Sequence, residues 1–180
     1  MSLALITCAG VALDAVLGWG RKPSAERAQK WAKALGLPLM RMEDGFLRSW
    51  GLGVDGEKPL SLISDGIGIY YDATRPSELE TLIKDKAKLT DLLADGERAC
   101  SLVLTHNLSK YNHAPSVWSA SLPFDKDKQN ILIIDQTAGD MALRYGYADQ
   151  NTFSQMLAAA LAEYPQADIW IKTHPDVLAG

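Results

Sequence analysis

The adjacent carboxylates Glu43 and Asp44 are the first side chains whose types suggest catalysis. They follow an apolar segment expected to form a buried strand, at the edge where open α/β sheets bind their ligands. Burial and a neighbouring charge both raise the pKa of a carboxyl group, which prepares it for acid or base catalysis near neutral pH. A solvated acidic turn is the commoner interpretation of an isolated Glu-Asp-Gly. Here Arg48, Trp50 and two glycines follow at once, which favours a functional loop.

Residues 135–140 form a second polar segment, again directly after an apolar strand. Gln136 is a candidate substrate ligand, and Gly139 allows the backbone to come close to a ligand. Asp140 has the chemistry of a carboxylate nucleophile or of a hydrogen-bond acceptor. An equally good interpretation makes Asp140 the N-cap of a following helix.

A third polar segment contains Lys172, His174 and Pro175. An imidazole beside a lysine suits contacts with a phosphate or a leaving group. Pro175 would fix the turn and begin a helix, and the N-terminus of a helix favours anions. The alternative is a capped turn with an exposed histidine.

Two weaker candidates complete the set. Residues 18–24 combine glycines with Arg21 and Lys22, which could meet an anionic substrate, but they match neither the Rossmann nor the P-loop spacing. Ser109 and Lys110 begin a polar cluster that could line a cleft.

The elements that must position these groups alternate between strands and helices. Apolar strands are expected over residues 3–7, 13–17 and 37–42, and a helix over 23–35 that begins at proline and ends before glycine. A strand, helix and strand in this order indicate a βαβ unit with a parallel sheet.

Further strands and helices are expected along the rest of the chain. Strands over residues 60–64 and 67–71, joined by Asp65-Gly66, predict a hairpin. The remaining expected elements are helices at 76–83, 90–107 and 152–164, and buried strands at 130–134 and 168–171.

The rhythm is interrupted only between residues 109 and 129, where prolines and alternating charges indicate a linker. We therefore expect an amino-terminal α/β domain over residues 1–108 and a second α/β half that starts at 130 and is incomplete at 180. The fold class is α/β, with two Rossmann-type halves built on parallel sheets.

Composition restricts the function further. The chain has 180 residues and a formal net charge of −4, which argues against nucleic-acid binding. Cys8 and Cys100 fit no metal-ligand spacing and are expected to be buried thiols, consistent with a cytoplasmic protein. The apolar start lacks the basic region of a signal peptide, and no apolar run is long enough to span a membrane.

Taken together and in order, the polar motifs resemble the capsule polysaccharide synthesis and export family. The similar motifs lie at residues 18–24, 43–53, 109–112, 135–140 and 172–176, so the resemblance covers about residues 13 to 178. Full members are longer and often carry two modules, so the chain is expected to be a piece of one module.

The resemblance implies a retaining β-Kdo transferase of GT-B-like architecture. Such enzymes take Kdo from CMP-Kdo and build a Kdo linker on a lipid acceptor, without a further cofactor or metal. It implies that Glu43 or Asp44 performs the acid/base step, that His174 and Pro175 hold the cytidine monophosphate, and that Asp140 is the nucleophile.

The resemblance also suggests partners and a location. The carboxylate of Kdo could be bound by Arg21, Lys22 or Arg48, with Ser109 and Lys110 lining the cleft. We expect a cytoplasmic protein with peripheral contacts at the inner membrane and with the capsule-assembly machinery. The alternatives are a non-catalytic export or assembly component, or another CMP-sugar enzyme such as a sialyltransferase.

Overall fold

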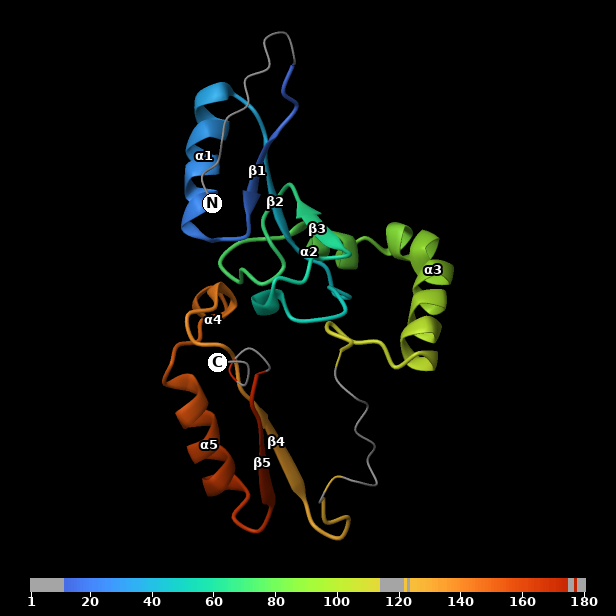
Figure 1. Ribbon diagram of the computed structural model, residues 1–180, viewed down its shortest axis with the longest axis vertical. Coiled ribbons are helices and arrows are strands. Elements are labelled where there is room, and N and C mark those ends of the chain that lie inside the picture. The colour runs from blue at the N-terminus through green and yellow to red at the C-terminus, as the bar shows by residue number, and fades with distance from the viewer. Residues whose placement is uncertain (1–11, 114–121, 123, 175–176, 178–180) are drawn as a thin grey trace.

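The computed structural model describes residues 12–113, 122, 124–174 and 177, and shows a mixed α/β protein with two separate sheets (Figure 1). Three strands in the order β1-β2-β3 form the sheet of the amino-terminal part. β4 and β5 form the sheet of the carboxyl-terminal part. The carboxyl ends of β1 and β2 point toward those of β4 and β5 (Figure 1). The predicted strand at residues 3–7 lies outside the described residues.

The predicted βαβ unit is present. Strand β1 (Val16–Trp19) leads through α1 (Pro23–Leu35) to β2 (Leu39–Asp44), and the two strands pair in parallel from Val16↔Leu39 to Trp19↔Met42. α1 begins with proline in its first turn and ends at Gly36, which adopts a left-handed conformation with φ 66°. The sequence contains both signals, and β1 and β2 lie only two or three residues later than predicted.

Small residues let α1 lie close to β1. Ala25, Ala28 and Ala32 form its buried face. A Cβ at Gly18 of β1 would stand 3.2 Å from the Ala28 Cβ, so the helix and strand pack at nearly the closest distance that their side chains permit. This contact fixes the turn between them, residues 20–22.

The predicted hairpin at Asp65-Gly66 is wrong. β3 (Leu62–Asp65) does pair antiparallel with β2, but residues 67–71 form no strand. The buried Asp65 carboxylate accepts hydrogen bonds from the backbone N–H groups of Ile67 and Gly68, and from that of Glu78 at the start of α2. Because this side chain satisfies the amides that a second strand would use, the chain bends back across the sheet edge and buries Ile69.

Two helices follow. α2 (Glu78–Lys84) starts with a capping box between Ser77 and Glu80, and α3 (Lys86–Thr105) extends to one side of the molecule (Figure 1). No residue of α3 is buried, so Cys100 is exposed, contrary to the expectation of a buried thiol. Cys8 lies outside the described residues. A short 3-10 helix, η1 (Gly53–Asp55), lies earlier in the loop after β2.

The carboxyl-terminal part follows the predicted pattern closely. β4 (Asn130–Ile134) and β5 (Asp168–Lys172) pair in parallel along their whole length, with α5 (Thr152–Glu163) between them in sequence. The N-cap interpretation of Asp140 anticipated α4 (Met141–Tyr145), a helix of 5 residues that hydrophobic periodicity does not indicate. α4 lies between the two parts (Figure 1).

A backbone hydrogen bond joins the two parts, and a second contact holds the loop after β2 within the amino-terminal part. The backbone N–H of Ala73 donates to the carbonyl of Tyr145 at the end of α4, over 3.0 Å. Tyr111 forms a bridge with Ser49, so the chain leaving α3 is anchored to the loop after β2. Within the described ranges, no helix combines the length and apolar character needed to cross a membrane.

Candidate active site

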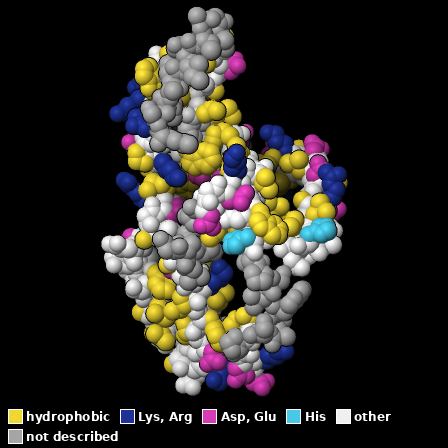
Figure 2. Space-filling view, viewed as in Figure 1, with side chains coloured by type: hydrophobic (Ala, Val, Ile, Leu, Met, Phe, Trp, Pro, Cys, Tyr) yellow, Lys and Arg dark blue, Asp and Glu magenta, His cyan; other side chains and the backbone are white. Residues whose placement is uncertain are grey.

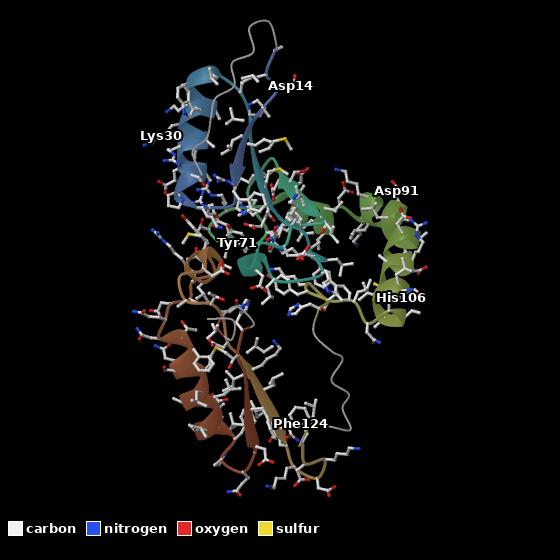
Figure 3. The ribbon with its side chains drawn as sticks, viewed as in Figure 1. Asp14, Lys30, Tyr71, Asp91, His106 and Phe124 are labelled. Atoms are coloured by element: carbon white, nitrogen blue, oxygen red, sulfur yellow. The ribbon has the colours of Figure 1, made fainter. Side chains whose placement is uncertain are left out.

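Glu43 lies at the end of β2, close to the turn that follows β1. The φ of Gly20 in that turn is 47°, and a Cβ there would stand 2.6 Å from the Glu43 Oε2 and would also collide with the Tyr71 hydroxyl. The backbone N–H of Arg21 donates to the same hydroxyl over 2.9 Å. A glycine at position 20 is therefore what allows Glu43 and Tyr71 to approach the turn together. Figure 3 shows Tyr71 near the junction between the amino-terminal and carboxyl-terminal parts.

The environment of Glu43 favours its protonated form. Burial raises the pKa of this carboxyl, and the charge of Asp44 raises it further, against the opposing effects of the Asp44 backbone N–H and of Lys22. A carboxyl group with a raised pKa at the end of a strand has the properties of a general acid or base.

Asp44 has a different environment although it is the next residue. Successive strand residues point to opposite faces of a sheet, and here Asp44 faces Arg48. The Arg48 Nε donates to the Asp44 Oδ2 over 2.7 Å, and its Nη1 donates to the Ser49 hydroxyl and the Glu57 carbonyl. Arg48 is only 8% exposed. In this geometry Arg48 holds Asp44 and the loop, and its contact with substrate stays a prediction.

Tyr71 and Asp72 connect this site to α4. Burial raises the pKa of Tyr71 to about 12, so its hydroxyl is neutral at physiological pH. Asp72 has a fully buried side chain that pairs with Arg21 over 3.2 Å and with Arg75 over 3.6 Å. Burial opposes ionisation of Asp72, but hydrogen bonds from Thr74 and the two arginines outweigh it and lower the pKa.

Arg21 also faces the carboxyl-terminal part. Its guanidinium carbon stands 4.4 Å from the ring centre of Tyr145, a cation–π geometry. Arg21 thus contacts both parts of the molecule, and its contact with an anionic substrate stays a prediction.

The second and third motifs meet at the edge of the other sheet. Because β4 and β5 pair in parallel, residues 135–140 and 172–174 leave the sheet side by side, and the Asp135 backbone N–H donates to the Lys172 carbonyl over 3.0 Å. The Thr137 hydroxyl lies 2.9 Å from the His174 Nδ1. Gln136 and the side chain of Lys172 are exposed at this edge. Pro175 lies outside the described residues.

Asp140 is the N-cap of α4, which confirms the second of the two interpretations of this residue in the sequence. Its Oδ1 accepts a hydrogen bond from the Ala142 backbone N–H over 2.8 Å. Its charge nevertheless contributes, with that of Glu43, to the raised pKa values of Tyr70 and Tyr71. Asp140 and Glu43 therefore act electrostatically on the same pair of tyrosines from opposite parts of the molecule.

Ser109 and Lys110 contribute mainly backbone contacts. The Lys110 carbonyl accepts hydrogen bonds from the N–H groups of Arg48 and Ser49, and the Ser109 hydroxyl donates to the Tyr111 carbonyl. The Asn112 side chain donates to the carbonyls of Ser49 and Ser109. This motif holds the loop after β2, and the substrate role of Ser109 and Lys110 remains a prediction.

Sequence reasoning missed Tyr71, Asp72 and Tyr145, and it missed Arg41 and Arg75. Tyr71 was assigned to a predicted strand that does not form, and Asp72 follows that segment directly. Tyr145 belongs to a helix too short to show periodicity. In the described part of the chain, no three His, Cys, Asp or Glu side chains gather as a metal site.

With this geometry established, comparison with known proteins identifies the class. The model of the capsule polysaccharide biosynthesis protein family matches residues 14–180. The chain belongs to this family, as the motifs indicated.

Two curated relatives place it more closely. The chain is 51% identical over 173 residues to the capsule polysaccharide modification protein LipA of Neisseria meningitidis serogroup A, covering 95% of this chain and 25% of LipA. It is 37% identical over 169 residues to the lipopolysaccharide-processing protein LpsZ of Rhizobium meliloti, covering 93% of this chain and 38% of LpsZ. The chain thus spans well under half the length of these relatives.

Solved structures confirm the GT-B-like α/β fold. A Thermosulfurimonas dismutans KpsC structure described as a β-Kdo 2,4 transferase matches with a TM-score of 0.81 and 46% identity, over 93% of this chain and 52% of that one. A KpsC structure described as a β-Kdo 2,7 transferase matches with a TM-score of 0.60 and 29% identity, over 91% of this chain and 47% of that one.

Proposed function

We propose that this chain belongs to a retaining glycosyltransferase that moves Kdo from CMP-Kdo to a lipid-linked Kdo acceptor during synthesis of the capsule linker. The observation that carries the proposal is the opposition of two strand edges, one bearing Glu43 and the other bearing Asp140 and His174, in a fold similar to KpsC. Ligands of open α/β sheets bind at such edges.

On the donor side, we assign the cytidine monophosphate to residues 135–137 and 172–175. Lys172 and His174 offer cationic and hydrogen-bonding groups to the phosphate, and Gln136 is exposed beside them. Charge that develops on the departing phosphate would be stabilised by these groups, which is how such sites lower the barrier to transfer. Pro175, which the sequence predicts to fix the turn, lies outside the described residues.

The transfer is proposed to proceed in two displacements. The Asp140 carboxylate attacks the anomeric carbon of Kdo, and the bond to the phosphate oxygen of CMP breaks with its electron pair leaving on CMP. An acceptor hydroxyl then attacks the same carbon, the bond to Asp140 breaks, and the hydroxyl proton passes to a carboxylate. Two inversions return the original configuration.

Glu43 is the better candidate for receiving that proton. Asp44 is bound to Arg48 over 2.7 Å, whereas Glu43 has a raised pKa caused by burial and lies beside Tyr71. A general base works best when its pKa approaches the working pH. The protonation role is therefore assigned to Glu43, and Asp44 is assigned to holding the loop.

The linkage formed is proposed to be of the 2,4 type. The match to the 2,4 transferase has a higher TM-score and a higher identity than the match to the 2,7 transferase. Both neighbours are described as β-Kdo transferases, so the two alternatives differ only in the acceptor hydroxyl. We also propose that the protein works at the cytoplasmic face of the inner membrane, where a lipid-linked acceptor is accessible.

A donor panel tests this function. The full-length gene product that contains this chain is incubated with a Kdo-terminated acceptor and either CMP-Kdo or CMP-sialic acid, and free CMP and acceptor mass are measured. We expect CMP release and acceptor mass gain with CMP-Kdo alone, and nuclear magnetic resonance of the product should show a β-2,4 linkage. Equal use of CMP-sialic acid would indicate another CMP-sugar transferase, and no turnover of any donor would indicate an assembly component.

A further inference from the structure

A strongly basic pocket lies along α1, outside the strand edges that carry Glu43 and Asp140. It has a volume of about 390 Å³, within the range of pockets that hold small molecules. Its lining includes six cationic side chains and one carboxylate: Arg21, Lys22, Lys30, Lys33, Arg41, Arg75 and Glu26. The chain as a whole has a formal net charge of −4, so positive charge is concentrated here against the overall balance.

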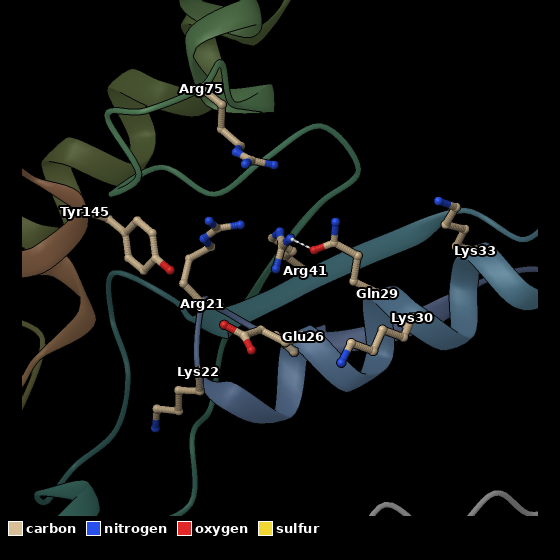
Figure 4. A pocket seen from close by; sticks show the side chains of 10 residues that line it. Arg21, Lys22, Glu26, Gln29, Lys30, Lys33, Arg41, Arg75 and Tyr145 are labelled. Atoms are coloured by element: carbon tan, nitrogen blue, oxygen red, sulfur yellow. Dashed lines mark hydrogen bonds between the residues drawn. The ribbon is translucent and has the colours of Figure 1, made fainter.

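Three arginines converge at the inner end of this pocket. Arg21, Arg41 and Arg75 come from the turn after β1, from β2 and from the segment before α2, and their guanidinium groups are directed toward one another (Figure 4). Arg41 is only 5% exposed. Its Nη1 donates to the Gly20 carbonyl over 2.8 Å, and its Nη2 donates to the Gln29 side chain over 3.4 Å.

The carboxylates nearby leave this charge largely uncompensated. Asp72 pairs with Arg21 and Arg75, so one buried carboxylate serves two guanidinium groups. Burial lowers the pKa of Arg41, and the charges of Arg21 and Arg75 lower it further because the three cations repel one another. An arginine nevertheless stays protonated in proteins. An anion entering the pocket would relieve this repulsion.

The pocket continues along α1 into a second pocket, and the two together form a basic groove. An adjoining pocket of about 290 Å³ shares Gln29, Lys33, Arg41 and Arg75 with it and also includes Asp65. Lys30 and Lys33 are exposed on α1 beyond the arginine cluster, and Figure 2 shows basic side chains gathered on the edge of the molecule where α1 lies. Cations spread along a groove suit a ligand with repeated negative charges better than a single phosphate.

We infer that this groove binds the carboxylates of an acidic oligosaccharide, the acceptor chain whose end is extended at the neighbouring site. The inference rests on the proposed function for the identity of the sugar, because Kdo carries one carboxylate per residue. The position of Arg21 supports it, since this residue lines the groove and its backbone N–H also contacts Tyr71 beside Glu43. A bound chain would therefore run from the groove toward the candidate catalytic carboxyl.

The test uses lysines that hold no other part of the structure. The double variant Lys30→Gln/Lys33→Gln is compared with Lys86→Gln/Lys88→Gln, which removes the same charge from the exposed start of α3. In the full-length gene product, the groove variant should raise the KM for a Kdo-oligosaccharide acceptor roughly three- to tenfold, the effect of losing two exposed charge pairs. The KM for CMP-Kdo and the kcat should stay unchanged, and the α3 variant should resemble the wild type.

A binding experiment separates this inference from the proposed function. A Kdo oligosaccharide without lipid, a neutral oligosaccharide of the same length and glycerol phosphate are each titrated into the wild type and the groove variant. Salt-sensitive binding of the Kdo oligosaccharide alone, weakened in the groove variant, supports the inference even if no transfer is seen. Equal binding of the neutral sugar, preferred binding of glycerol phosphate, or an unchanged acceptor KM in an active enzyme would overturn it.

Discussion

Two neighbouring carboxylates in this chain have different surroundings because successive side chains of β2 point to opposite faces of the sheet. Glu43 points toward the Gly20 turn and Tyr71, and Asp44 points toward Arg48. The sequence left open which of the two performs the acid/base step, and the alternation of side chains along β2 gives them different surroundings. Only one of them is left with the environment of a proton acceptor.

The stability of a Glu43→Gln variant should show how strongly the fold disfavours the charged carboxylate. The folded pKa of Glu43 is raised, so its contribution to stability is fully present below the unfolded pKa and is lost as the pH rises through the folded pKa. Glutamine resembles the protonated form at every pH. The melting temperature of the variant should therefore exceed that of the wild type at pH 7 and 8, with the difference shrinking toward pH 4.

The exposed Glu97 provides the control, because Glu97→Gln on α3 should show no such pH-dependent gain. A Glu43→Gln variant that is less stable than the wild type at pH 8 would contradict the assignment of a destabilised charge at this position.

Asp140 presents two roles that one substitution can separate. Asparagine caps helices as well as aspartate does, whereas alanine does not. Asp140→Asn should keep the melting temperature and lose turnover by on the order of 10³-fold or more, as expected for a lost nucleophile. Asp140→Ala should lose turnover and also about 1 kcal/mol of stability. Full turnover in the asparagine variant would leave Asp140 with the capping role alone.

At the scale of elements, the turn between β1 and α1 determines how the site is assembled. Gly20 has a φ of 47° and has no room for a side chain, because Glu43 and Tyr71 occupy the space. Gly36 at the end of α1 has a similar φ of 66°, but a Cβ there would meet no atom within 4 Å. The two glycines therefore share the backbone requirement and differ only in the steric one.

Replacing each glycine by alanine isolates that difference. Both variants should lose roughly 1–2 kcal/mol of stability for the left-handed backbone. Gly20→Ala should lose more and should also reduce turnover, because Glu43 or Tyr71 must move. Chemical denaturation and CMP release measure the two effects, and equal activity in both variants would show that the Gly20 turn does not position the site.

The elements that sequence could predict are those with local signals. α1 carries its own proline start and glycine stop, and β4 is a continuous apolar run, so both were predicted within a few residues. The segment after β3 was not, because the Asp65 side chain bonds to backbone amides near and far in sequence, and one of them belongs to α2. Which residue such a carboxylate will bind depends on tertiary structure that the sequence pattern does not contain.

At the scale of the whole molecule, the candidate site depends on contact between the amino-terminal and carboxyl-terminal parts. The strand order placed Glu43 at one edge and residues 135–140 and 172–175 at another, and the parallel pairing of β4 with β5 confirms the second grouping for residues 135–140 and 172–174. That α4, Tyr145 and Arg21 connect the two edges could not be predicted, because a helix of 5 residues has no detectable period. The basic groove was equally hidden, since its arginines come from three separate segments.

Transfer of Kdo by the full-length gene product, measured beside its Glu43→Gln variant, is the most direct test of a Kdo transferase with a base at the end of β2. With CMP-Kdo and a Kdo-terminated acceptor, the wild type should release CMP and add Kdo to the acceptor. The variant, shown to be folded by its melting temperature, should be slower by about 10²- to 10⁴-fold. Equal rates in the two proteins would contradict the assignment of Glu43, and no transfer by the wild type would contradict the function itself.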